Sequence, residues 1–427
     1  MAASLWTDDF LNQMRQETDP PADRAVATVF ESGDRQAVNG IMTNLYRNDQ
    51  PVPGDLPEPI RHYLEETSSL PDWANDEQLR EAQQLFNIWG LSSCVILSCA
   101  SLPECYVMKN GVNVLAMTQR IELHVRRRIL ETAQMIMDVM SPGGLSPGGR
   151  GIAAAQRVRL MHASIRWLIL HPQAHTGPEP EGESAVTKLF EADGWDPAYG
   201  KPICQEDLAF TLQTFAHVAL RSFDRLSIDL TDAQKDSYIA CWNVTGAVMG
   251  IRQELLPADH KEAEQLFAII KRRQAGENAA ARAMAAALIQ FQQNVLPGPL
   301  KDLPIVMTRH LIGDETAALL GVEEADDRRR KLAMEALELW RKVDSRLSKE
   351  YGHHEVLRFA SEIINNMMLR EMGQIPRGWK KQLFAIPSQL EANLPKEWDG
   401  DLFSLPKHIG EDLLGKIKAF GDRLHEK

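Results

Sequence analysis

Apolar residues recur three and four positions apart along most of this chain, and no stretch alternates regularly between apolar and polar residues. The observed period is that of an amphipathic helix, whereas a half-buried strand has a period of two. The spacing therefore predicts an all-α fold. The predicted helices cover residues 23–31, 35–46, 57–66, 76–98, 112–140, 152–170, 184–193, 205–226, 231–253, 258–292, 302–311, 314–320, 327–349 and 353–371.

Short joints that contain proline and glycine separate the predicted helices. Examples are "PVPGDLPEP" at 51–59 and "SPGGLSPGGRG" at 141–151. Joints of this length are typical of turns inside one compact body rather than of interdomain linkers. We therefore predict a single domain over residues 1–373. Residues 374–427 differ in composition, with proline, lysine and tryptophan, and are predicted to form a tail that wraps onto this domain.

The charge and the cysteines narrow the class of protein. A formal net charge of -12 without a basic stripe argues against a nucleic-acid partner, because phosphates repel such a surface. No stretch reaches the ~18 uninterrupted apolar residues of a membrane span. The start of the chain has no apolar run of signal length, and none of the five cysteines forms a CxxC pair. These features predict a cytoplasmic protein with free thiols and leave its oligomeric state open.

The stretch "RVRLMHASIR" carries the first candidate site. Arg159 and Arg166 lie three residues before and four residues after His162, so all three share one helix face. Two permanent cations favour the neutral form of a histidine, and neutral imidazole is a metal ligand. The alternative is a structural histidine bonded to the backbone, beside arginines in ordinary ion pairs.

A second helix could face His162 from across the glycine-rich joint. The helix predicted at 112–140 carries Arg120 and His124 four residues apart, hence on one face. Such a helix pair can sandwich a flat cofactor. Further upstream, Pro103 in "LPECY" fixes the backbone beside Glu104, whose carboxylate in an apolar pocket can act as a general base. The alternative for Glu104 is a salt bridge at a helix end. His217, in "TFAHVAL", is predicted to be a core histidine.

The order and spacing of these motifs resemble the latex clearing protein family, which includes the fungal oxygenase of the mycophenolic acid pathway. "LPECY" is followed after sixteen residues by Arg120 and then by the arginine-flanked His162. "TDPPADRAVATVF" is similar to the opening helices of the family, and residues 207–257 are similar to its central helices. "LPIVMTRHLIGDETAALLGV" resembles its late segment. The resemblance covers residues 20–370.

The resemblance implies a haem b protein with a globin-like helical core enlarged by additional helices. It places His162 at the proximal ligand of the iron, and Arg159 and Arg166 at the arginines that flank this ligand. Guanidinium groups there would neutralise haem propionates through bidentate hydrogen bonds.

The same resemblance assigns the distal side of the haem. It makes Glu104 the catalytic base and Arg120 the distal arginine. Rubber-cleaving members of the family carry a lysine and a threonine shortly after that arginine, whereas this chain has Leu123 and His124. In this chain we expect His124 to govern the sixth coordination position, or to hydrogen-bond bound oxygen.

The resulting functional prediction is a haem b-dependent oxygenase that uses O2 on an apolar small molecule. The expected reaction is oxidative cleavage of an alkene C=C bond to carbonyl products. Two alternatives remain open. One is a haem oxidase or peroxidase in which Arg120 and His124 assist peroxide cleavage, and the other is a non-catalytic helical protein that binds haem or a lipid-like ligand.

Overall fold

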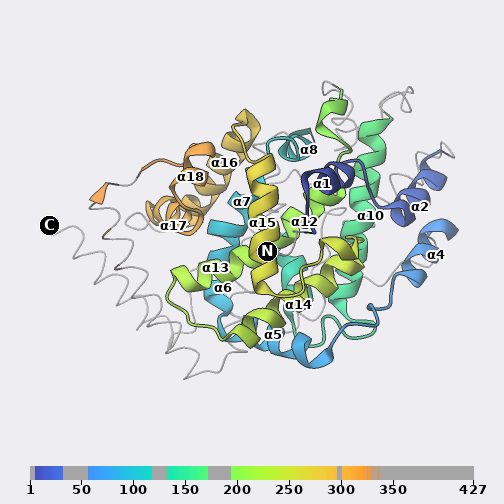
Figure 1. The fold of residues 1–427 in the computed structure, drawn as a ribbon, viewed down its shortest axis with the longest axis horizontal. Coiled ribbons are helices and arrows are strands. Elements are labelled where there is room, and N and C mark those ends of the chain that lie inside the picture. Colours follow the sequence, from blue (N-terminus) through green and yellow to red (C-terminus); the bar gives the residue numbers. More distant parts are fainter. Residues whose placement is uncertain are drawn as a thin grey trace, which may run out of the picture.

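The computed structural model describes residues 5–31, 56–117, 132–171, 194–295, 301–324, 326, 327, 331 and 335. Every regular element that it describes is a helix, which confirms the all-α prediction (Figure 1). These are α1 (Asp8–Met14), α2 (Pro20–Phe30), α4 (Glu58–Glu66), α5 (Asp76–Ile88), α6 (Gly90–Ile96), the π-helix η1 (Leu97–Ser101), α7 (Leu102–Tyr106), α8 (Val112–Met117), α10 (Arg150–Leu170), the 3-10 helix η3 (Pro197–Tyr199), α12 (Gln205–Phe215), α13 (His217–Arg225), α14 (Asp232–Val248), the 3-10 helix η4 (Gln253–Leu255), α15 (His260–Gln274), α16 (Ala279–Val295), α17 (Leu303–Ile312) and α18 (Asp314–Leu319).

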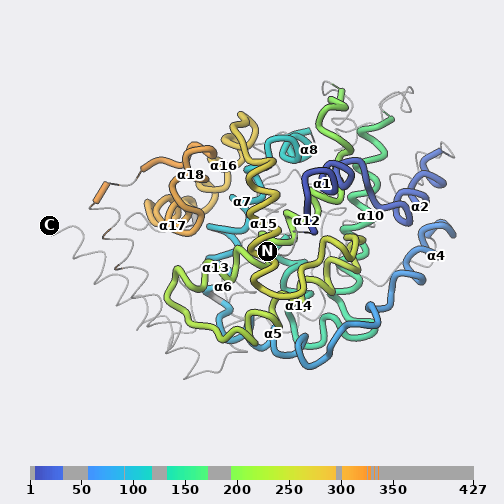
Figure 2. Tube along the Cα trace, viewed as in Figure 1, coloured from blue at the N-terminus to red at the C-terminus, as the bar shows by residue number. Residues whose placement is uncertain are grey.

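A large apolar core lies where α5, α12, α14 and α15 pack together. Among its fully buried side chains are Phe86, Phe210, Tyr238 and Trp242. A second apolar cluster joins α2 and α4 to the C-terminal half of α10. Figures 1 and 2 show α2 and α4 beside α10 at one end of the molecule, and α16, α17 and α18 at the opposite end.

The helix predicted at 258–292 is wrong as one element, because the structure divides it into α15 and α16. α15 ends where Ala275 adopts extended dihedral angles and pairs with Met108 in an isolated bridge. The Asn278 side chain then accepts a hydrogen bond from the N–H of Ala280 at 2.8 Å. Asparagine is a preferred N-cap residue, so Gly276 and Asn278 were the local signals for this break.

Two other predicted helices also divide, and two α-helices, α1 and α7, were missed. Residues 205–226 form α12 and α13, with the break at Ala216, and residues 76–98 are interrupted at Trp89. The π-helix η1 directly precedes α7, whose second residue, Pro103, has no N–H to donate back along the helix. The unpredicted helix α1 begins at an N-cap, Thr7, whose side chain accepts from Phe10 N.

Some predictions concern residues outside the described part of the chain. They are the helices at 35–46, 184–193 and 353–371, nearly all of the helix at 327–349, and the tail at 374–427. Among the described residues, no single helix is long and apolar enough to cross a membrane. α5 and the segment Ser92–Tyr106 pass such a test only as a pair bent by 89°. Both parts of this pair contribute side chains to the large core.

The glycine-rich turn before α10 brings two backbones unusually close together. A Cβ placed on Gly144 would lie 2.0 Å from the carbonyl oxygen of Asp138. We therefore expect Gly144→Ala to lower the free energy of unfolding by about 1–3 kcal/mol or more, since the backbone must shift to admit the methyl group. Gly194 has open space around it, so Gly194→Ala should change stability by less than about 0.5 kcal/mol. Urea unfolding of both variants measures the difference, and equal losses would contradict this explanation.

Candidate functional site

Helix α10 carries the predicted iron ligand on its least buried face. Most side chains of this helix are buried, including both arginines that flank His162. Val158, Met161, His162 and Ile165 are only partly buried. Their spacing of three and four residues places them along one side of the helix. His162 therefore lies on an apolar, half-buried stripe rather than in the tightly packed core.

Arg159 binds helix α2 through a buried ion pair. Its Nε and one terminal nitrogen donate to the two carboxylate oxygens of Asp19 at 2.5 and 2.7 Å. The other terminal nitrogen donates to the carbonyl oxygen of Val248 at 3.1 Å. The guanidinium group also lies over the ring of Tyr63, 5.4 Å from its centroid. Each of the three guanidinium nitrogens of Arg159 therefore donates a hydrogen bond to a protein group.

Arg166 also binds helix α2, one turn after Asp19. It forms an ion pair with Asp23, and its other nitrogens donate to the carbonyl oxygens of Pro202 and Ile203 at 3.0 and 2.9 Å. These contacts are the ordinary ion pairs that the sequence left open as the alternative for Arg159 and Arg166. A direct contact of either arginine with haem stays a prediction.

The distal residues predicted from the sequence, Arg120, Leu123 and His124, lie outside the described residues. The chain enters that segment from α8. Val114 of α8 belongs to the same apolar cluster as Leu160 of α10. The helix that precedes Arg120 and His124 therefore contributes to the same apolar cluster as the helix that carries His162.

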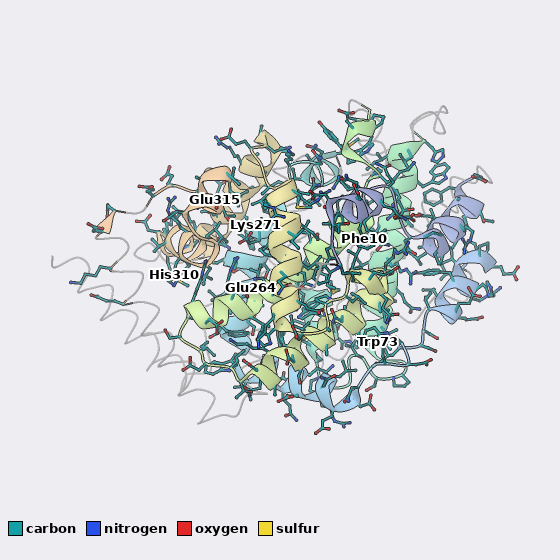
Figure 3. All side chains as sticks on the ribbon, viewed as in Figure 1. Phe10, Trp73, Glu264, Lys271, His310 and Glu315 are labelled. Carbon is teal, nitrogen blue, oxygen red and sulfur yellow. The ribbon has the colours of Figure 1, made fainter. Side chains whose placement is uncertain are left out.

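Glu104 is fully buried and forms two ion pairs. One carboxylate oxygen accepts from Arg221 at 2.6 Å, and the other accepts from Lys271 Nζ at 2.9 Å. Lys271 also donates to the Thr316 hydroxyl at 2.7 Å. Figure 3 shows Lys271 on α15, on the side toward the helices that carry His310 and Glu315. Glu104 therefore forms the salt bridge that the sequence analysis left open as the alternative to a general base, and it pairs with two cations.

The end of α17 supplies further acceptors to this cationic group. Arg221 and Arg225 donate to the carbonyl oxygen of Leu311, and Arg225 also donates to that of His310. The last carbonyls of a helix carry partial negative charge, so they stabilise cations near them. The sequence interpretation missed Arg221 and Lys271. Each lies more than a hundred residues from Glu104, and no local motif marks them.

His217 is buried in the core. Its ring lies 5.2 Å from that of Phe267. Burial, together with the positive charges of Arg221, Lys271 and His260, lowers the pKa of His217 to about 3. The imidazole is therefore neutral in the folded protein at physiological pH.

This pKa makes stability depend on pH. In the unfolded chain a histidine titrates near ~6.5, so below that pH the unfolded state binds a proton that the folded state does not. The contribution to stability is complete above pH ~6.5 and falls by about 1.4 kcal/mol per pH unit toward the folded value. We expect His217→Leu to flatten the decline of the urea midpoint between pH 7 and about 5. An unchanged slope would show that another group causes the decline.

The described residues include the sequence-predicted iron ligand, His162, which is set among apolar side chains. They contain no group of three or more His, Cys, Asp or Glu side chains placed to hold a metal ion. A haem iron takes four ligands from the porphyrin and needs one axial ligand from the protein. The porphyrin face also needs apolar neighbours. His162 on the stripe of Val158, Met161 and Ile165 fits both requirements.

Comparison with known proteins places the chain in a family. A sequence profile described as "ER-bound oxygenase mpaB/B'/Rubber oxygenase, catalytic domain" matches residues 107–342, more than half of the chain. The chain belongs to this family. The resemblance inferred from the sequence motifs is thereby confirmed. The family assignment makes the chain an oxygenase, and the matched range includes Arg159, His162 and Arg166, whereas Glu104 lies just before it.

One relative and one solved structure are similar to this chain. The rubber oxygenase of Streptomyces sp. (strain K30) is 26% identical over 325 residues, which are 72% of this chain and 69% of that protein. A solved structure of latex clearing protein LCP in the closed state has a TM-score of 0.60 at 21% identity. That likeness covers 89% of this chain and 88% of the other, and shows the same fold.

Proposed function

We propose that this oxygenase uses haem b to cleave an alkene C=C bond of an apolar substrate into two carbonyl products. The observation that carries the proposal is the position of His162, a potential metal ligand on an apolar, half-buried stripe of α10. Membership of the oxygenase family supports the reaction class. The substrate class follows the rubber oxygenase relative, whose name implies an isoprenoid alkene.

His162 would hold the iron through one imidazole nitrogen, and Val158, Met161 and Ile165 would contact the face of the macrocycle. When bound, haem would supply the activation of O2, which the side chains of this chain do not provide themselves. The apolar stripe would keep water away from the haem on the side that α10 covers. Arg120 and His124 are further residues that we propose for catalysis, and Leu123 would contact the haem.

Glu104 is the proposed proton acceptor. Removing an allylic proton from the alkene eases attack at the neighbouring carbon, and a carboxylate held in a buried position can accept it. Both oxygens of Glu104 already accept from Arg221 and Lys271. One of these contacts would have to lengthen while the proton is held, and the other cation would keep the carboxyl group in place.

The reaction balances without an added reductant, because both atoms of O2 enter the two carbonyl groups that replace the C=C bond and Glu104 returns the allylic proton before the products leave. The test is incubation of the haem-loaded protein with squalene, a linear isoprenoid alkene, under 18O2. The proposal expects shortened aldehyde and ketone products that carry the label at both new carbonyls. Products that form only when hydrogen peroxide is added would instead support the peroxidase alternative. No products with O2 or peroxide would overturn catalysis on this substrate class.

A further inference from the structure

Two ion pairs join α2 to α10 on either side of His162. Asp19 and Asp23 stand one turn apart on α2, and Arg159 and Arg166 stand two turns apart on α10. His162 lies between the two arginines along the helix. The two helices also share an apolar cluster. The ion pairs therefore fix the relative orientation of helices that otherwise contact each other through apolar side chains.

The N-terminus of α2 is built so that Asp19 is available for Arg159. Asp19 is the N-cap residue, yet its side chain makes no capping hydrogen bond. Pro20 and Pro21 follow it, and proline has no N–H to offer a capping carboxylate. Both oxygens of Asp19 therefore bind the guanidinium group. Asp23 accepts from the backbone N–H of Asp19 at 3.3 Å, which ties the two carboxylates together.

The loop after α14 leaves room for the first ion pair. Gly250 has a φ of +82°, a conformation that favours glycine. A Cβ there would lie 2.5 Å from Arg159 Nε and 2.6 Å from Asp19 Oδ2. Gln205 donates to the carbonyl oxygens of Thr18 and Gly250 and holds both segments beside the pair. The ion pair is thus enclosed on several sides.

We propose that Asp19 and Asp23 are positioning residues for the iron-ligating histidine. Two bonds that bracket His162 fix the rotation of α10 about its own axis, and this rotation sets the direction of the imidazole ring. In this arrangement the two carboxylates act on His162 through the arginines, which anchor α10 to α2. The inference rests on the proposed function, since it concerns the haem that His162 would ligate.

The test uses the haem-loaded protein with Asp23→Asn, chosen because the Asp23 side chain is 28% exposed and tolerates the change better than Asp19. Substitution of a group that orients a metal ligand commonly weakens metal affinity by about 10–100-fold. We expect haem transfer to excess apomyoglobin to accelerate by a similar factor, and the rhombic splitting of the ferric electron paramagnetic resonance signal to change. Asp23→Glu, which keeps the charge, should restore most of both properties.

Asp138→Asn is the matched control. Asp138 is a buried carboxylate that pairs with Arg150 at the N-terminal end of the same helix, away from His162. The Asp138→Asn variant should be less stable than the wild type and should keep the wild-type resonance signal. If Asp23→Asn does not fold, Arg166→Lys keeps the charge and removes the fork-shaped contact, with the same expected result.

The outcomes separate the two proposals. The positioning role would be overturned if Asp23→Asn lost haem at the wild-type rate and gave the wild-type resonance signal. It would also be overturned if Asp138→Asn changed both properties as much as Asp23→Asn does. Either result would leave the haem proposal intact. Wild-type protein that binds no haem would overturn the proposed function and this inference together.

Discussion

Replacement of His162 by alanine is expected to leave the protein folded but unable to retain haem. His162 is the imidazole on the half-buried stripe of α10, and its side chain is not needed to fill the tightly packed core. Without an axial ligand the iron loses its bond to the protein, and apolar contacts alone hold haem weakly. Haem content per chain after gel filtration measures the effect, with circular dichroism to confirm that the helices persist.

His62→Ala is the control for this prediction. His62 lies on α4, and its side chain is 68% exposed, so its loss should leave haem content unchanged. Imidazole added to His162→Ala should restore part of the haem content by entering the space that the side chain leaves. A His162→Ala protein with full haem content and an unchanged Soret band would show that another residue ligates the iron.

Replacement of Glu104 by glutamine is expected to reduce both stability and turnover. Removal of one partner of a buried ion pair costs about 3–5 kcal/mol, because the remaining charge loses its compensation. Arg221 and Lys271 keep roughly a fifth of their side chains exposed, so a loss toward the lower end of that range is expected. If Glu104 is also the proton acceptor, turnover should fall by ~10²–10⁴.

Lys271→Met separates the two roles of Glu104. This variant breaks one ion pair and leaves the carboxylate and Arg221 in place. Its stability should fall, as in Glu104→Gln, while its turnover should fall much less. Equal losses of turnover in the two variants would mean that Glu104 only holds α7 to α13 and α15. Stability unchanged in Glu104→Gln would contradict the energetic role of the ion pairs.

Local patterns were sufficient to predict much of the fold. The period of the apolar residues indicated α10 and α14 within a few residues, because both helices have buried faces that repeat every three to four positions. The breaks at Ala216 and Trp89 were missed because the apolar period continues through them. Packing of α12 and α13 against different neighbours determines such breaks, and a single sequence does not show that packing.

The candidate site was predictable only in part. The shared face of Arg159, His162 and Arg166 follows from helix geometry alone. The acceptors of the arginines do not, since Asp19 precedes Arg159 by 140 residues. The same holds for Lys271, which lies 167 residues after Glu104. Residue spacing along one chain carries no information on such pairs, although the unusual "DPP" at the start of α2 was a hint that Asp19 has a partner elsewhere.

The most direct test of the central claim is the visible absorption spectrum of the purified wild-type protein, produced with an adequate supply of haem and checked as its pyridine haemochrome. The account predicts a Soret band and stoichiometric haem b that is lost on His162→Ala. A wild-type spectrum without a Soret band, which added haem does not restore, would contradict it.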